Sequence, residues 1–130
     1  MVVDYKDANE TEFKGMIYLK NVEIKRMSQY DTTRAAIRFQ KSGSSLKAPG
    51  STVERCSISH SSAWAVAINA AKDITFNENV IYDTYRNAIK VEGVTDFTMT
   101  GNLIVKNNPR IWDPSLKLKD HQVAVDLCSG

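Results

Sequence analysis

The chain has 130 residues, the length of a single domain. Its 17 basic and 15 acidic residues give a net charge of +2, so composition gives no electrostatic reason to expect nucleic acid as a partner. No apolar run approaches the roughly 20 residues of a membrane helix, and we expect no membrane insertion by this segment. The polar start, residues 1–7, also lacks the apolar core of a secretory signal, which predicts a cytosolic protein or an excised piece of a longer one.

Residues 1–14 show no repeat pattern and are predicted to form a lead-in strand or tail, ahead of a repeat region over residues 15–130. This first segment contains one glycosylation sequon, Asn9-Glu10-Thr11, which makes Asn9 a possible glycosylation site. Such a triplet also arises often by chance, so it gives only mild support for a secreted origin.

The rest of the chain repeats itself. Ser51–Asp73 and Ile74–Asp96 share the same apolar register at a period of 23 residues. A third copy starts at Phe97, and an earlier one spans Ile17–Phe39. A unit this short cannot bury its own apolar face and must stack on its neighbours.

Within each unit, apolar residues alternate at i, i+2, which is the period of a β-strand. Three such pairs recur in each of the four units, and 21 of these 24 positions are apolar, against 42% hydrophobic residues in the chain. They are Ile17/Leu19, Ser51/Val53, Ile74/Phe76 and Phe97/Met99, then Val22/Ile24, Cys56/Ile58, Asn79/Ile81 and Asn102/Ile104, then Ile37/Phe39, Val66/Ile68, Ile89/Val91 and Val123/Val125. The pattern predicts an all-β fold, a right-handed parallel β-helix of about four turns, or rungs, with three sheets and no long α-helix.

Two of the polar exceptions, Asn79 and Asn102, occupy the same position in adjacent rungs. Stacked at the strand spacing of roughly 4.8 Å, their amides could bond to each other and to the turn backbone as a structural ladder. The alternative is that both residues simply lie in turns, where Asn is common. Cys56 has the same position one rung earlier and is expected to be a small buried hydrophobe.

Three corners are longer than in the regular rungs, those from Ile24 to Ile37, from Phe39 to Ser51 and from Ile104 to Val123. The loop Asn107–Asp120 carries Trp112, which we expect to be a packing anchor over one end of the helix rather than a ligand platform. The two cysteines, Cys56 and Cys128, are two rungs apart and too distant for a disulfide, so we expect free thiols or an external partner for Cys128. No Cys/His cluster suggests a metal, and no motif suggests a cofactor.

Enzymes built on β-helices need clustered carboxylates. The outward positions do not supply them: one row is Arg26, His60, Asp83, Lys106, and the other is Gln40, Asn69, Glu92, Asp126. Such mixed rows usually form a solvated ladder of weak ion pairs. His60 beside Asp83 is a weak candidate for an acid–base pair. Trp64, Tyr82 and Tyr85 are weak candidates for glycan binding, although aromatic side chains more often cover a corner of the core.

The segments GMIYLKNVEIKRMSQ, RAAIRF, VERCSISHSSAWAVAI, NENVIYDTYRNAIKVEG, TGNLIV and HQVAVDL, in this order, resemble the parallel β-helix region of the fibrocystin family. The likeness covers roughly Gly15–Leu127. Fibrocystins are large ciliary and stereociliary ectodomain proteins, more distantly related to hyaluronan-depolymerising cell-surface proteins. The resemblance implies an extracellular or ciliary β-helix inside a much larger protein. No catalytic motif of the hyaluronan-degrading relatives can be placed on these residues.

Two functions therefore stay open. The first is a non-catalytic structural or adhesion module whose two ends are covered by further rungs of the same polypeptide or by other subunits, because stacked strands leave unpaired edges at each end. The second is a carbohydrate-active β-helix enzyme, a polysaccharide lyase or hydrolase. Two carboxylates within about 10 Å of each other in a groove would favour the second.

Overall fold

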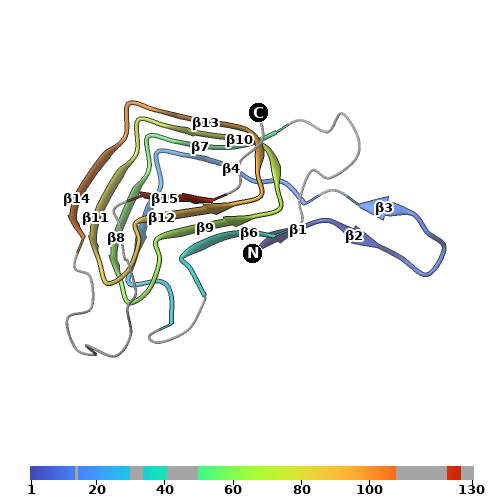
Figure 1. Ribbon diagram of the computed structural model, residues 1–130, viewed down its shortest axis with the longest axis horizontal. Helices are drawn as coiled ribbons and strands as arrows, with labels where there is room; N and C mark the ends of the chain where they lie inside the picture. The colour runs from blue at the N-terminus through green and yellow to red at the C-terminus, as the bar shows by residue number, and fades with distance from the viewer. Residues whose placement is uncertain (14, 30–33, 41–49, 108–122, 127–130) are drawn as a thin grey trace.

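The computed structural model describes residues 1–13, 15–29, 34–40, 50–107 and 123–126. The insertions after Gln40 and Asn107, Trp112 and Cys128 lie outside this part of the chain. The described residues form fifteen short strands and no helix, hence no helix long and apolar enough to cross a membrane. The strands coil into a parallel β-helix, as the repeat predicts (Figure 1).

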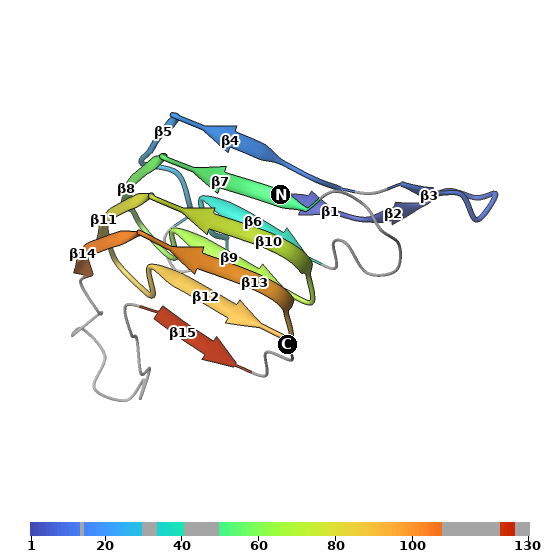
Figure 2. The same cartoon turned by 90° about the horizontal axis from the view of Figure 1, so that it is seen from above.

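Three parallel sheets make up the sides of the coil, and each rung contributes one strand to each sheet (Figure 2). The first sheet contains β4 (Tyr18–Lys20), β7 (Ser51–Glu54), β10 (Lys72–Asn77) and β13 (Thr95–Thr100). The second contains β5 (Glu23–Lys25), β8 (Ser57–Ser61), β11 (Val80–Thr84) and β14 (Leu103–Asn107). The third contains β6 (Ile37–Gln40), β9 (Val66–Asn69), β12 (Ile89–Glu92) and β15 (Val123–Asp126), with β1 (Val2–Val3) added at its edge.

The strand register is the one that the sequence period predicts. Ile74 pairs with Ser51 on one side and with Phe97 on the other, and Ile81 lies between Ile58 and Ile104. In the third sheet, Ile89 lies between Val66 and Val123. Equivalent residues therefore stack directly over one another.

The core runs through the centre of the coil. In the second and third rungs, the inward residues of all three sheets are buried, including Val53, Phe76, Ile81, Ile89 and Val91 at 0% exposure. At the two ends of the coil, some residues that were predicted to be buried are exposed. Val22 and Met99 each keep 37% exposure, because among the described residues β5, which begins just after Val22, and β13, which contains Met99, each have a neighbouring strand on one side only.

The corners depend on a backbone conformation that the sequence pattern does not reveal. Between the first and second sheets, four equivalent residues have positive φ: Asn21, Arg55, Glu78 and Gly101, at 51–62°. The predicted outward row Arg26, His60, Asp83 and Lys106 is a second such column, at 54–57°. A left-handed residue costs a non-glycine side chain roughly 1–2 kcal/mol, so each corner is held against strain by the bonds around it.

The first residues join the coil through β1, where Val2 is buried and pairs with Phe39. The chain then forms an antiparallel hairpin of β2 (Tyr5–Lys6) and β3 (Glu12–Phe13), which projects away from the coil (Figure 1). Asn9 is exposed in the hairpin turn, where its backbone N–H donates to the carboxylate of Asp7 at 2.9 Å.

Candidate functional site

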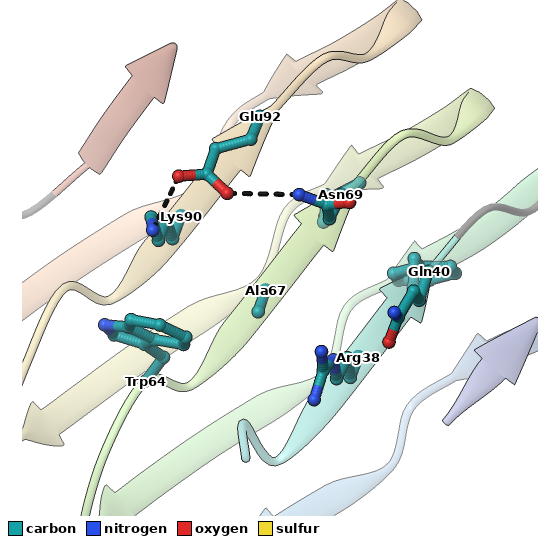
Figure 3. Close-up of a pocket in the computed structure, with 9 residues that line it drawn as sticks. Arg38, Gln40, Trp64, Ala67, Asn69, Lys90 and Glu92 are labelled. Carbon is teal, nitrogen blue, oxygen red and sulfur yellow. Dashed lines mark hydrogen bonds and ion pairs between the residues drawn. The ribbon is translucent and has the colours of Figure 1, made fainter. Parts of the chain in front are cut away.

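A groove lies on the outer face of the third sheet. Its volume is about 260 Å³. It lies over β9, where the outward side chain is the small Ala67, while the neighbouring strands present Arg38 and Lys90 at the same register (Figure 3). The two flanking strands are two strand spacings apart, roughly 10 Å. The groove therefore exists because a short side chain stands between two long ones.

Polar groups line the groove two residues further along the same three strands. Gln40, Asn69 and Glu92 lie side by side across β6, β9 and β12, as the outward row of the sequence predicts. Asn69 Nδ2 donates to Glu92 Oε2 at 3.1 Å, and Lys90 Nζ lies 2.6 Å from Glu92 Oε1. The hydrogen bond from Lys90, and after it the one from Asn69, lowers the pKa of Glu92 below its ordinary value of 4.5. The stabilisation from this ionised carboxylate is thus present above pH 4.5 and is lost as the pH falls through the lowered pKa.

Trp64 closes one end of the groove (Figure 3). The Lys90 ammonium lies 4.9 Å from the centroid of the indole ring, and the Arg86 guanidinium carbon lies 5.9 Å from it. These cation–π contacts hold the ring in place but also occupy ring surface that a sugar would stack on. Arg38, across the groove, forms no ion pair with any described residue, which leaves it as the lining cation available to an anionic ligand.

The other two aromatic candidates lie elsewhere. The groove lining contains neither Tyr82 nor Tyr85. Tyr82 is on β11 in the second sheet, where its ring meets the His60 ring edge-on at 5.8 Å and Lys106 Nζ lies 5.3 Å from its centroid. Tyr85 is exposed in the turn after β11. The structure thus does not assemble the three aromatic residues into one platform.

His60 and Asp83 lie next to each other, as the sequence register implies. His60 Nε2 is 3.7 Å from Asp83 Oδ2, beyond the usual hydrogen-bond range. Lys106 Nζ lies 3.5 Å from the other carboxylate oxygen of Asp83, and the carboxylate, followed by Tyr82, raises the pKa of Lys106. A carboxylate that lies between the His60 imidazole and the Lys106 ammonium on an outer corner is the arrangement of a polar ladder that includes an ion pair. It lacks the second carboxylate that glycoside hydrolysis requires.

The asparagine ladder occupies the corner between the first and second sheets. Asn79 is fully buried, and Asn102, one rung later, is half-buried. Asn79 Oδ1 accepts from the Cys56 backbone N–H, while its Nδ2 donates to Val53 O and to Asn102 Oδ1, all at 2.9 Å. Asn102 Oδ1 also accepts from the Asn79 backbone N–H at 2.9 Å, and its Nδ2 donates to Phe76 O at 3.0 Å. Each amide thus ties its own rung to the preceding one.

Sequence reasoning missed three features around these sites. Ala67, the floor of the groove, has no chemical signal of its own and is recognisable only from its place between Arg38 and Lys90. The unpaired state of Arg38 among the described residues depends on side-chain geometry. Gly50, just before β7, lies so close to the backbone oxygen of Asp73 that a Cβ could not fit there. The sequence of the turn does not indicate this close approach between neighbouring rungs.

Fold and sites together define a parallel β-helix module held by a buried asparagine ladder. The family model described as CEMIP beta-helix matches residues 10–124, most of the chain, and the chain belongs to this family. It is also similar to fibrocystin from the dog, Canis lupus familiaris, with 25% identity over 112 residues, which supports a fibrocystin-like β-helix region. That match covers 86% of this chain but only 3% of the length of the relative. No solved structure gives a significant match.

Proposed function

We propose that this chain is a non-catalytic structural or adhesion module of a larger fibrocystin-like assembly at the cell surface or cilium. The observation that carries the proposal is the state of the two ends. Inward side chains that are fully buried in the central rungs become half-exposed in the first and last ones, as at Leu19 and Phe97. In the described part of the chain, no element covers the outer edges of β4, β5, β13 or β14. Open parallel edges with exposed apolar side chains favour a unit that works in contact with neighbours.

The family relationship supports the same proposal. A similarity confined to 3% of a far longer relative fits a unit whose neighbours are other parts of a large protein. The likeness to fibrocystin supports an extracellular or ciliary location. Among the described residues, no group of three or more His, Cys, Asp or Glu side chains could hold a metal ion, and no two carboxylates face each other across the groove.

Sedimentation velocity of the isolated chain at micromolar concentration tests the module proposal. We expect the chain to self-associate or aggregate, because water-exposed parallel edges recruit other strands. A stable, soluble monomer with both ends accessible to hydrogen exchange would refute the proposal.

The groove at Trp64 favours a second candidate, the binding or processing of a polysaccharide. An indole, the Arg38 guanidinium and the amides of Gln40 and Asn69 are groups that hold sugars in protein sites. Its lining contains a single carboxylate, Glu92, which is engaged by Lys90 and Asn69, so this candidate is stronger for binding than for cleavage.

Incubation with hyaluronan and with polygalacturonate separates the two candidates. We expect no new reducing ends from either polymer. For binding, Arg38→Ala should weaken retention on the immobilised polymer, whereas Arg26→Ala, which removes an exposed Arg outside the groove lining, should not. Chain cleavage that is lost with Glu92→Gln would instead establish the enzymatic candidate.

A further inference from the structure

The corner between the first and second sheets presents the same pair of backbone donors in successive rungs. In the second rung, Arg55 N–H donates to Asn77 O at 3.0 Å and Cys56 N–H donates to Asn79 Oδ1 at 2.9 Å. In the third rung, Glu78 N–H donates to Thr100 O at 2.9 Å. The Asn79 N–H donates to Asn102 Oδ1 at the same distance. Each pair is thus satisfied by the following rung, through one backbone carbonyl and one asparagine side chain.

In the fourth rung, the corresponding donors are the N–H groups of Gly101 and Asn102. Neither forms a hydrogen bond with any described residue. The matching acceptor on the same edge is the carbonyl oxygen of Met99, because its equivalents Val53 O and Phe76 O accept from the next asparagine Nδ2. Two donors and one acceptor therefore point off the C-terminal end at fixed spacing. Backbone groups that become buried need such partners.

The same end exposes apolar surface. Met99, which points inward, keeps 37% exposure, and Phe97 and Ile104 are only half-buried. On the outer face of β14, Leu103 is 54% exposed and continues an apolar column from Val80. Equivalent outward positions in the first two rungs are polar, Glu23 and Ser57. The end that carries the unsatisfied corner is thus also the more apolar end of the second sheet.

From these groups we infer that the C-terminal edge binds a further β-helix rung that carries asparagine at its corner, two residues after a strand carbonyl. This inference rests on the proposed role as a module and names the neighbour. The amide Oδ1 would accept from Asn102 N–H, its Nδ2 would donate to Met99 O, and the carbonyl two residues earlier would accept from Gly101 N–H. Aspartate could supply the acceptor but no donor, and leucine could supply neither.

A second copy of this chain satisfies the edge only in part. Its first rung has Asn21 and Val22 at the corner, with Val22 at the position of the asparagines. Val22, at the position of Asn79 and Asn102, has no side-chain oxygen or nitrogen. Head-to-tail stacking of identical copies would therefore bury the Asn102 N–H and the Met99 carbonyl without their side-chain partner, which is costly.

The test extends the full chain by one rung. A copy of Ile74–Asp96 is joined directly after Gly130, which keeps the five-residue step that leads from Asn69 to Ile74 and from Glu92 to Phe97. The matched control carries leucine in place of asparagine at the copy's equivalent of Asn79. Amide hydrogen exchange is measured by NMR in the unextended chain and in both extended chains.

In the extended chain, we expect Gly101 and Asn102 amides to exchange about tenfold or more slowly than in the unextended chain, with a higher thermal midpoint. With the leucine control, the Asn102 amide should lose most of that protection, whereas the Gly101 amide, which needs only a backbone carbonyl, should keep more of it. Equal exchange in all three proteins would overturn the inference.

The unextended chain decides the matter if an extension does not fold. There, Gly101 and Asn102 should exchange far faster than their third-rung equivalents Glu78 and Asn79, and protection equal to theirs would overturn the inference. The two proposals fail separately. Self-association in sedimentation without protection by the added rung leaves the module role standing and removes the asparagine-bearing neighbour, whereas a stable monomer removes the module role itself.

Discussion

Phe76→Ala is expected to lower the free energy of unfolding by about 3–5 kcal/mol, among the largest effects of any single truncation in this core. Phe76 is among the largest fully buried side chains, at 0% exposure. It lies inward on β10 between Val53 and Met99, and its ring centroid is 6.5 Å from that of Phe97. The neighbouring rungs are fixed by backbone ladders on both sides of β10, so they cannot move in to fill the cavity. Urea denaturation followed by circular dichroism measures the loss as a lower midpoint at constant slope.

Phe97→Ala is the matched control, because it removes the same side chain from the next rung. Phe97 is only half-buried at the open end, so its truncation should cost clearly less than that of Phe76. Equal losses for the two variants would mean that the fourth rung is covered as completely as the third. That result would contradict the open end on which both the proposed function and the further inference depend.

The fold could be predicted from the sequence because the apolar positions repeat at a fixed period. A spacing of 23 residues aligns Val53, Phe76 and Met99, and in a parallel stack that alignment is the strand register itself. The repeat also determines which strands pair, since each strand pairs with the equivalent strand of the neighbouring rung. The same reasoning puts Asn79 and Asn102 in contact, because identical residues in one register lie one strand spacing apart.

The corners and the ends could not be predicted in this way. Hydrophobic period says which face of a strand is buried but nothing about φ, and the left-handed column contains Arg55 and Glu78 as well as Gly101. Exposure at Val22 depends on whether another rung precedes it, and exposure at Met99 on whether another rung follows, and neither is a property of the residues themselves. The groove arises from differences in side-chain length across Arg38, Ala67 and Lys90. A pattern of apolar and polar positions contains no information on side-chain length.

A buried amide ladder and an open end have one physical origin. Each asparagine satisfies donors of the preceding rung and, in doing so, exposes its own backbone N–H to the following one. Each such rung therefore leaves a donor for the next one, and among the described residues the backbone N–H of Asn102, the last member, has no partner. The hydrogen bonds that stabilise the internal corners thus also indicate which groups a neighbouring rung must present, an asparagine amide and a backbone carbonyl.

Asn79→Leu is expected to destabilise the chain by at least about 2 kcal/mol, because it leaves two buried backbone groups without partners at about 1–3 kcal/mol each. The Cys56 N–H loses its acceptor and the Val53 carbonyl loses the amide donor. Leucine has a similar size and greater hydrophobicity, so a loss of stability would report the hydrogen bonds rather than packing. Urea denaturation at neutral pH measures the change, and a variant as stable as the original chain would show that the ladder does not hold the corner.

Two further variants separate the roles of the amide. Asn79→Asp keeps an acceptor for Cys56 N–H but cannot donate to Val53 O, and it also buries a charge, so it should be at least as destabilising as leucine unless the carboxyl is protonated. Asn102→Leu removes the equivalent bonds to Asn79 N–H and Phe76 O at a half-buried position, where water can replace part of what is lost. Its cost in the unextended chain should be smaller than that of Asn79→Leu. In the chain extended by an asparagine-bearing rung, the position of Asn102 becomes internal, and the cost of Asn102→Leu should rise toward that of Asn79→Leu.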